Sequence, residues 1–506
     1  MKTKNNKPVI GLINPQGHVR WNNLQIAEHP DTGGQIVYIL ELSKELAKSG
    51  CRIDIFTRFY DDKNWPGYNK LMEKLNDNLR IIRIKCGPEN KFLKKEDLWS
   101  VINIFTCGIV DFYENKGYKP DIFWSNYGDA GLAAAILKEK TGIPFIHTGH
   151  SLGGQKIDKL KINRNNFKVI NDKFRFHFRI AAERIANRNS SAIITSTGEE
   201  IKKQYGHKIY GGSLSGAKKF NVIPPGIAPS TFFSYLLKEN KIEMYNKAVI
   251  KMKSLLARSI ENSRLDLPCI YSASRLDAKK NPTGLLKAYA ISKKLQGMAN
   301  LFIVAGKTND PINKNNYKKL KENEKIIVDE IKDIFSQYPD LTSKVCFAPG
   351  FEYTTEMPYI YRYGSRHKWV FINPALHEPF GLTVIEAMAS GMPVAATKNG
   401  GPIEILDNNR YGLLINPHSS LSTARRLIKL FDKKTWNMYS ERGLKRVKEK
   451  YTWGVTAKGY LKLIKETMSS ASFPGKDTKI PIYFSEPNLK NENKLIARFK
   501  KLYPLR

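Results

Sequence analysis

The stretch FINPALHEPFGLTVIEAMASGMPVAATKNGGP, residues 371–402, decides the fold of the second half of the chain. Its pattern predicts a buried strand, a turn at 377–381, a helix from Leu382 to Ser390 and a second buried strand. A strand followed by a helix and another strand is the unit from which parallel sheets are built. The turn comes where a strand ends and a helix begins, so we expect the amides of Gly381 and Leu382 to meet a diphosphate.

Two carboxylates accompany this turn. Glu378 comes just before it and can accept hydrogen bonds from the hydroxyls of a bound sugar. Glu386 lies one turn into the helix and suits the diol of a ribose. Neither acid needs to be a nucleophile in this arrangement.

Strand and helix patterns alternate along most of the chain. Strands are predicted at PVIGLIN, RIDIFTR, RIIRIKCG, DIFWSNYG, PFIHTGH and AIITST, and then at CIYSASRLD, LFIVAG, KVCFAPG, WVFINPA, PVAATKNGG and LLINP. The prolines and glycine of NVIPPGIAP interrupt this rhythm near Pro225. The pattern predicts an α/β protein with two doubly wound, Rossmann-like domains that face each other across a ligand cleft. We place the first domain at 1–225 with a return segment at 470–506, and the second at 226–469.

Composition narrows the classes of function. The 506 residues carry a net charge of +36 and are 41% hydrophobic, which is enough apolar side-chain area for two cores. The lysines and arginines are mixed with acids and accompany no known nucleic-acid-binding motif, so we expect no nucleic-acid partner. No run of eighteen apolar residues predicts a membrane span. Five separate cysteines and a first strand in place of a signal peptide favour reduced thiols and a cytoplasmic location.

Sequence motifs for metals are missing. None of the twenty aspartates lies two positions from another, so the chain has no D-x-D motif, which serves metal-diphosphate binding in one class of glycosyltransferase and phosphate cleavage in one class of phosphatase. His147 and His150 have no third ligand nearby in the sequence. We therefore expect no metal and no other cofactor.

Glycine-rich and basic turns offer another way to bind phosphate. Gly33 and Gly34 precede a predicted helix in DTGGQIVYILEL, where helical amides favour an anion. The alternative is a tight turn with Asp31 or Thr32 as the N-cap. SRLDAKKNPTGLLKAY follows a strand and supplies Arg275 and Lys280 for a diphosphate; a solvated loop is the alternative there.

The motifs E-P-F-G-L-x-x-x-E-A-x-A-x-G-x-P and N-G-G-P resemble the nucleotide-sugar signature of retaining glycosyltransferases of the GT-B fold, family 4. HPDTGGQIVYILELSKELA, FWSNYGDAGLAAA, TGHSLGGQK, VIPPGI and SASRLDAKKNPTGL are similar to the sucrose-phosphate synthases, in the same order. The resemblance implies transfer of glucose from UDP-glucose to fructose 6-phosphate, giving sucrose 6-phosphate and UDP in sucrose biosynthesis. Plant-type members carry a phosphatase-like domain, which the length and the missing D-x-D motif argue against here, so a separate phosphatase is expected downstream.

The resemblance also implies roles for individual residues. Two residues, His150 and Glu378, would contact the transferred glucosyl group as the catalytic residues. The donor would be bound by seven residues: Gly33, Gly34, Arg275, Lys280, Gly381, Leu382 and Glu386. Gln35 would reach the acceptor, whose 6-phosphate would be held by Lys95, Lys156 and Arg179.

Some alternatives remain open in the sequence. Arg179 lies four positions before Glu183 and could form only a helical ion pair with it. A mannosylfructose-phosphate synthase, which uses GDP-mannose, or another family-4 transferase would share most of these motifs. A basic RNA-binding protein would use the same charge, but it would need stacking aromatic residues in basic strands, and none is convincingly placed.

Overall fold

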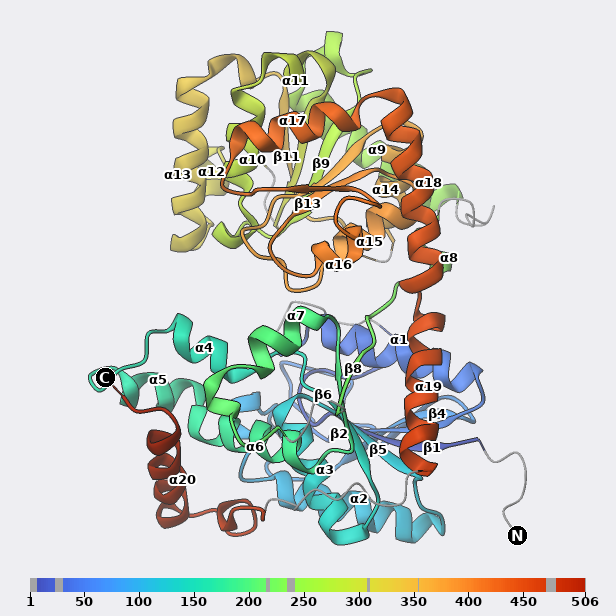
Figure 1. The fold of residues 1–506 in the computed structure, drawn as a ribbon, viewed down its shortest axis with the longest axis vertical. Helices are drawn as coiled ribbons and strands as arrows, with labels where there is room; N and C mark the ends of the chain where they lie inside the picture. The colour runs from blue at the N-terminus through green and yellow to red at the C-terminus, as the bar shows by residue number, and fades with distance from the viewer. Residues whose placement is uncertain are drawn as a thin grey trace. The chain divides into compact units, whose positions relative to one another are not determined.

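The computed structural model describes residues 7–22, 31–214, 219–233, 242–306, 310–353, 355–469 and 479–505. The chain divides into two compact units (Figure 1). Unit 1 comprises Met1–Pro225 and Trp453–Arg506, and unit 2 comprises Gly226–Thr452. Each unit has its own sheet and its own hydrophobic cores.

Unit 1 is built on an eight-stranded sheet. Its strands are β1 (Val9–Ile13), β2 (Arg52–Arg58), β3 (Met72–Asn76), β4 (Leu79–Ile84), β5 (Ile122–Asn126), β6 (Phe145–Thr148), β7 (Ala192–Thr195) and β8 (Phe220–Val222). The strand order is β3-β4-β2-β1-β5-β6-β7-β8, and only the pair of β3 and β4 is antiparallel. The chain winds outward from β1 in both directions, as the doubly wound prediction requires.

The helices of unit 1 cover this sheet. They are α1 (Gly34–Lys48), α2 (Ile102–Lys116), α3 (Tyr127–Thr141), α4 (Gly153–Lys159), α5 (Phe167–Phe174), α6 (Phe176–Asn189), α7 (Gly198–Glu200), α19 (Trp453–Ser469) and α20 (Leu489–Leu502), with short helical turns at Lys95–Asp97, Ile201–Tyr205, Lys208–Tyr210 and Ile482–Phe484. Helices α2, α3 and α6 pack in a row, α20 packs on α6, and α19 packs on α1. Figure 1 shows α1 above the strands of this unit and α2 and α3 below them.

The return of the chain to unit 1 begins earlier than the sequence suggested. We predicted that the return segment starts at residue 470, but α19 already belongs to unit 1. The physical reason is its packing on α1: the hydroxyls of Tyr38 and Tyr460 lie 2.7 Å apart, and the rings of Tyr38 and Trp453 meet edge to face. Residues 470–478, at the start of the predicted return segment, lie outside the described part of the chain.

Unit 2 is built on a six-stranded parallel sheet in the order β11-β10-β9-β12-β13-β14. Its strands are β9 (Cys269–Ser274), β10 (Asn300–Ala305), β11 (Val345–Ala348), β12 (Val370–Asn373), β13 (Val394–Thr397) and β14 (Leu413–Ile415). Its helices are α8 (Pro229–Phe232), α9 (Ile242–Ser259), α10 (Pro282–Ala290), α11 (Lys293–Met298), α12 (Lys314–Tyr317), α13 (Glu322–Gln337), α14 (Met357–Arg366), α15 (Leu382–Ala389), α16 (Pro402–Leu406), α17 (Ser420–Leu430) and α18 (Lys433–Lys450), with short turns at Asn262–Arg264, Ala278–Lys280 and Pro339–Leu341.

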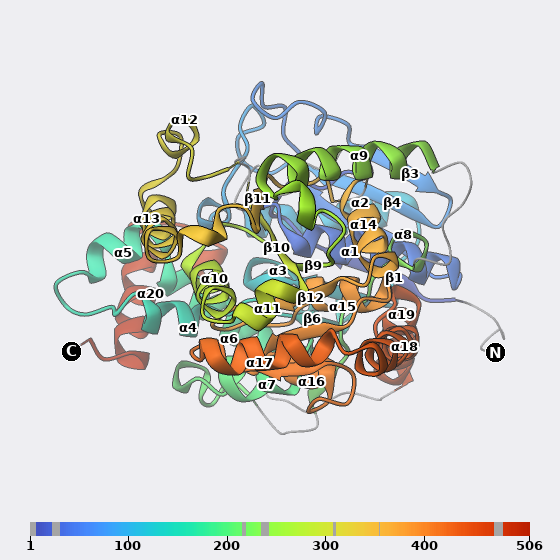
Figure 2. The same ribbon diagram turned by 90° about the horizontal axis from the view of Figure 1, so that it is seen from above.

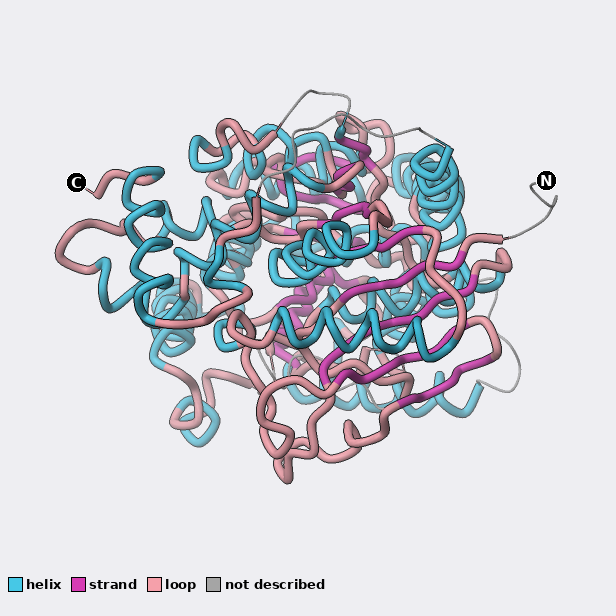
Figure 3. The backbone as a smooth tube through the Cα atoms, turned by 90° about the horizontal axis from the view of Figure 1, so that it is seen from below, coloured by secondary structure: helices cyan, strands magenta, loops and turns pink. Residues whose placement is uncertain are grey.

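Helices bury both faces of the sheet in unit 2. Phe302 and Val304 of β10 join one core, whereas Leu301 and Ile303 join the other, as expected from alternation along a strand. Burial on both faces explains why these strands read as continuous apolar runs in the sequence. Figure 2 shows α10, α11 and α17 of this unit, and Figure 3 shows the strands in magenta with helices around them.

All twelve predicted strands are present, and β3 and β8 were missed. Both missed strands lie at the edges of their sheet and are short and partly exposed, so they carry little apolar pattern. Thr197 is the N-cap of α7, since its hydroxyl accepts a hydrogen bond from the amide of Glu200 at 3.1 Å. The carboxylate of Glu200 reaches the amide of Ser196 and so lies one residue away from a standard capping box.

The Gly400–Gly401 pair allows two backbone segments to touch beside α15. The amide of Gly401 donates to the carbonyl of Glu378 at 2.9 Å. A Cβ on Gly400 would lie 2.0 Å from that carbonyl oxygen, and a Cβ on Gly401 would lie 2.3 Å from the carbonyl oxygen of Phe380. Gly400 also has a φ of 111°, which residues with a Cβ rarely adopt. These two glycines therefore fix the turn that holds Glu378.

Replacing Gly400 by Ala should destabilise unit 2 by at least about 2 kcal/mol, because the substitution adds both a backbone clash and a left-handed strain. Gly297→Ala is the matched control, since a Cβ there meets no described atom within 4 Å and Ala favours the helix α11. Urea unfolding of the two variants measures the effect. Equal unfolding midpoints would contradict the role assigned to Gly400.

Candidate active site

The candidate residues of each unit lie at the carboxyl ends of parallel strands. In unit 1, Asn126 ends β5 and His150 follows β6. In unit 2, Arg275 follows β9 and Glu378 follows β12. This edge is where open α/β sheets bind their ligands. Each unit therefore carries its own cluster of candidate groups.

The first cluster begins with a buried ion pair between Asp31 and Lys95. The carboxylate of Asp31 is almost fully buried, pairs with the ammonium of Lys95 and accepts a 3.0 Å hydrogen bond from the amide of the same lysine. This pair joins the loop before α1 to the helical turn at Lys95–Asp97. Asp31 is not the N-cap of α1, since Gly33 occupies that position without a side-chain cap.

Lys95, Lys156 and Arg179 come from three different elements and gather in one region. Lys95 and Arg179 line a common pocket, together with Phe174. The ammonium of Lys156 lies 3.7 Å from the centre of the Phe174 ring. Burial, followed by the charges of Arg179 and Lys95, lowers the pKa of Lys156 to about 8. A lysine whose pKa is lowered by neighbouring positive charges is typical of a site that receives an anion.

Arg179 also forms the ion pair that the sequence allowed as an alternative. Its Nε donates to Glu183 at 2.8 Å, and its Nη2 donates to the carbonyl of Ser151 at 2.8 Å. Glu183 is buried and also accepts from the amide of Gly153 and the hydroxyl of Tyr210. The ion pair therefore belongs to the interior, and it orients Arg179 toward the pocket without occupying its Nη1.

Asp129 lines the same pocket and was missed by the sequence analysis. It is buried, and no residue in the described chain donates a hydrogen bond to its Oδ2. Burial raises the pKa of this carboxyl to about 7. A buried oxygen without a partner is costly, so a hydroxyl of a bound ligand would satisfy it. Asp129 lies in the first turn of α3, where acidic residues are common, so the sequence did not distinguish it as a site residue.

His150 lies beside Tyr127 at the start of α3. The rings are stacked with centres 5.3 Å apart, and both residues have a positive φ, of 55° and 73°. Such backbone strain is concentrated at functional sites. The Nε2 of His150 is 2.8 Å from the Oδ1 of Asn126, and burial lowers the pKa of the imidazole to about 4. His150 is therefore neutral at physiological pH, with Nε2 protonated and Nδ1 able to accept.

The glycines before α1 leave open space. A Cβ on Gly34 would meet no described atom within 4 Å, and one on Gly33 would meet only the side chain of Gln35. No described neighbour requires glycine at these two positions, which fits close approach of a ligand. Gln35 was predicted to reach the acceptor, but its Nε2 donates to the carbonyl of Asp31 at 3.1 Å and holds its own loop.

The second cluster is built around the turn after β9. Asn281 begins α10 in a left-handed conformation, and its amide donates to the carbonyls of Pro374 and Pro417 at 3.1 and 3.0 Å. These bonds anchor the turn to the segments that follow β12 and β14. Arg275 is exposed, and its guanidinium has no partner among the described residues. Lys280 is occupied, because its ammonium lies 2.8 Å from the carboxylate of Glu378.

Glu378 thus pairs with a residue that the sequence analysis assigned separately to the diphosphate. Its Oε2 accepts from Lys280 and, at 3.1 Å, from Asn373. Its Oε1 has no partner in the described part of the chain, so it can accept from a hydroxyl. The pair with Lys280 fixes the carboxylate of Glu378 just before the start of α15.

The N-terminus of α15 has backbone amides that are available to bind a ligand. Gly381 is its N-cap with a φ of 112°, and the backbone amides of Gly381, Leu382 and Thr383 donate to no described residue. Orphan amides and the helix dipole together favour a bound anion. This arrangement of amides is the one expected for the predicted diphosphate contact.

The side chain of Glu386, which was predicted to bind a ribose, is buried and already hydrogen-bonded to protein groups. Its two carboxylate oxygens accept from the hydroxyls of Tyr353 at 2.9 Å and Tyr361 at 3.2 Å. Burial raises its pKa to about 7. Tyr361 is buried, whereas Tyr353 is partly exposed, so Tyr353 is the partner that a ribose could replace. Neither tyrosine was identified from the sequence, because both come from a segment distant in the chain.

The described residues contain neither a group of metal ligands nor a membrane-spanning helix. In that part of the chain, no three His, Cys, Asp or Glu side chains are grouped to hold a metal ion. No described helix is long and apolar enough to span a membrane. The absence of a metal requirement remains a prediction.

Family models match both parts of the chain. Residues 8–254 match the model of the first GT-B domain of sucrose synthase. Residues 256–446 match the model of glycosyl transferases group 1. A solved sucrose-phosphate synthase from Thermosynechococcus elongatus superimposes with a TM-score of 0.63 at 22% identity, over 92% of this chain and 100% of that one. This likeness supports the GT-B fold.

Whole-chain relatives identify the family. A probable sucrose-phosphate synthase of Thermosipho melanesiensis is 36% identical over 441 residues, which are 87% of this chain and 92% of that protein. A sucrose-phosphate synthase of Zea mays is 32% identical over 88% of this chain, but the match covers only 46% of the maize protein. The fold, the two clusters and these relatives show that the chain is a GT-B glycosyltransferase and belongs to the sucrose-phosphate synthase family.

Proposed function

We propose that this chain is a retaining glucosyltransferase that moves glucose from UDP-glucose to fructose 6-phosphate, with sucrose 6-phosphate and UDP as products. The observation that carries the proposal is the cluster of Lys95, Lys156 and Arg179 in unit 1. Two cations that line one pocket, and a third that lies against the Phe174 ring of its lining, suit a phosphorylated acceptor better than a neutral sugar. The names of the relatives agree with this choice of acceptor.

Unit 2 would bind the donor. Arg275 and the free amides at the start of α15 would hold the diphosphate, and Lys280 would join them when the sugar enters. Glu378 would accept from hydroxyls of the glucosyl group through Oε1, and Glu386 would accept from the ribose. A diphosphate held in this way needs no divalent metal and no other cofactor.

The chemistry exchanges one bond at the anomeric carbon for another. The bond from that carbon to the β-phosphate oxygen breaks, and the bond to the fructose oxygen forms on the same face. The proton of the acceptor hydroxyl passes to the leaving phosphate, so neither Glu378 nor Glu386 becomes a nucleophile. The protein contributes positioning and charge stabilisation. His150, being neutral, would accept a hydrogen bond from a sugar hydroxyl at Nδ1 and would take no part in the proton transfer to the leaving phosphate.

A mannosylfructose-phosphate synthase is the second candidate. It would use GDP-mannose with the same acceptor cage, which is formed by Lys95, Lys156 and Arg179. In unit 2, the free carboxylate oxygen of Glu378 can accept from hydroxyls of either sugar. Steady-state release of nucleoside diphosphate from UDP-glucose, ADP-glucose and GDP-mannose separates the candidates, with fructose 6-phosphate and fructose as acceptors. We expect UDP-glucose with fructose 6-phosphate to react fastest, equally with or without EDTA, and the product to keep its phosphate for a separate phosphatase.

Lys156→Met should lower kcat/KM for fructose 6-phosphate roughly 10- to 100-fold, since one charge-assisted contact is worth about 1.5–3 kcal/mol. The wild-type value should also fall as the pH rises through about 8, where Lys156 loses its proton, and the variant should lack this decline. Lys159→Met on the same helix is the control, because Lys159 is exposed and contacts no described acid. Equal losses in both variants would argue against the cage.

Arg179→Ala is a less clean test of the same cage. Removing this guanidinium leaves the buried carboxylate of Glu183 without its cation, which costs about 3–5 kcal/mol of stability. Arg179→Lys retains a positive charge beside Glu183, so the preference for fructose 6-phosphate over fructose should fall while the protein stays folded. An unchanged preference would mean that Arg179 only supports the scaffold.

Glu378→Gln and Glu386→Gln should separate turnover from donor binding. Glu378→Gln should lower kcat about tenfold or more, since Glu378 contacts the reacting sugar, whereas Glu386→Gln should mainly raise the donor KM. Gln preserves the volume in the buried site of Glu386 and can still accept from a tyrosine hydroxyl. Steady-state kinetics with varied donor provide the measurement. The assignment fails if both variants raise the donor KM equally and leave kcat unchanged.

A further inference from the structure

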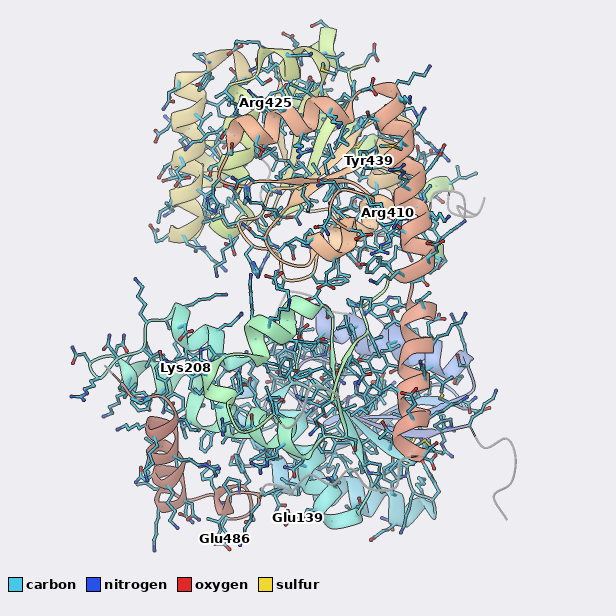
Figure 4. All side chains as sticks on the ribbon, in the orientation of Figure 1. Glu139, Lys208, Arg410, Arg425, Tyr439 and Glu486 are labelled. Carbon is cyan, nitrogen blue, oxygen red and sulfur yellow. The ribbon has the colours of Figure 1, made fainter. Side chains whose placement is uncertain are left out.

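A second pocket in unit 1 lies between α6, the turn at Gly212–Ser213 and α20. Three arginines line it: Arg184 and Arg188 from α6 and Arg498 from α20. Figure 1 shows α6 beside α20, and Lys208, labelled in Figure 4, marks the helical turn that precedes Gly212. This pocket shares no lining residue with the acceptor pocket, where Arg179 lies on the same helix.

The described lining of this pocket carries positive charge without an acid to balance it. Burial lowers the pKa of Arg184, and the charges of Arg498 and Arg188 lower it further. His177, which also lines the pocket, is neutral because burial and Arg175 lower its pKa to about 3. The acid in the first turn of α20, Glu492, is not part of the lining, but its carboxylate contacts Arg175 and lies 3.2 Å from Nε2 of His177. Three like charges on a lining that contains no acid favour a bound anion.

Arg184 and Arg498 have donors left for a ligand. Nη1 of Arg184 donates to the carbonyls of Ile209 and Gly211, which leaves its Nε and Nη2 without a described partner. Nη1 of Arg188 donates to the carbonyl of Gly212 at 3.1 Å. Arg498 is exposed and has no described partner. A guanidinium with free N–H groups matches the oxygens of a phosphate.

The remainder of the lining is apolar. Ile180 and Ile185 of α6 face Leu495, Phe499 and Leu502 of α20 across the pocket. A site with an apolar floor and a few convergent cations suits an organic anion more than a bare ion.

We propose that this pocket is a second binding site, specific for a small phosphate monoester with an apolar body. Arg184 and Arg498 bind the phosphate group, Arg188 adds positive charge to the same lining, and the apolar side chains contact the body of the molecule. The site is separate from the acceptor pocket and does not depend on the proposed function.

The pocket is connected to the acceptor cage by hydrogen bonds. Arg184 holds the turn at Lys208–Tyr210 through the carbonyl of Ile209, and the hydroxyl of Tyr210 donates to Glu183. Glu183 in turn accepts from Arg179. The same hydroxyl of Tyr210 accepts a 2.9 Å hydrogen bond from the amide of Gly154, in the helix that carries Lys156. A ligand that draws Arg184 away from the turn therefore weakens the support of the acceptor cage.

Titration calorimetry of the full chain with phenyl phosphate tests the binding site. The measurement uses a Lys156→Met background, which removes most phosphate binding at the acceptor cage. We expect one site whose Kd rises at least tenfold in Arg498→Ala and stays unchanged in Lys501→Ala, an exposed cation on the same helix that does not line the pocket. Inorganic phosphate should bind more weakly than phenyl phosphate, because it lacks the apolar body.

Three results would overturn the proposal. The first is no binding of phenyl phosphate in the Lys156→Met background, which would assign all binding to the acceptor cage. The second is an equal loss in Arg498→Ala and Lys501→Ala, which would indicate only general surface charge. The third is equal affinity for phenyl phosphate and inorganic phosphate, which would remove the apolar part of the site.

A kinetic readout tests the connection between the two pockets and, unlike the calorimetry, rests on the proposed function. Phenyl phosphate should raise the KM for fructose 6-phosphate at least twofold more in wild type than in Arg498→Ala. Direct competition at the acceptor cage would raise it equally in both and would contradict the connection. Absence of any transferase activity would instead disprove the proposed function and leave the calorimetric result standing.

Discussion

The buried carboxylate of Glu183 is the interaction on which both pockets of unit 1 depend. It accepts from the amide of Gly153 in α4, from Arg179 in α6 and from the hydroxyl of Tyr210. One acid thus fixes the helix that carries Lys156, the guanidinium of the acceptor cage and the turn that borders the second pocket. A buried charge of this kind must keep its partners, because losing one leaves the carboxylate uncompensated in a medium of low dielectric.

Acids hold the candidate cations in place elsewhere as well. Asp31 pairs with Lys95, and Glu378 pairs with Lys280. The chain has a net charge of +36, so neighbouring cations repel one another. Pairing with an acid keeps such a cation in position before an anionic substrate binds. They also reduce the reorganisation that binding requires, which is how a preorganised site contributes to catalysis.

The sequence predicted the strands and the positions of the turns well, because buried parallel strands and glycine-rich turns have strong local patterns. It could not predict the partners of individual side chains. Gln35 contacts its own loop, and Tyr353 contacts Glu386 from a position 33 residues away, which no local pattern reveals. The start of the return segment at Trp453 was missed for the same reason, since the packing of α19 on α1 is a tertiary contact. Local rules explain the glycines at 400–401 only when the facing backbone is known.

The central claim is that Lys95, Lys156 and Arg179 bind the phosphate of a sugar acceptor. A crystal structure of the chain with UDP and fructose 6-phosphate tests it most directly. The account predicts that the 6-phosphate oxygens lie within hydrogen-bonding distance of all three side chains, with Arg179 still paired to Glu183. A phosphate bound elsewhere, with these three cations in contact only with protein and solvent, would contradict it.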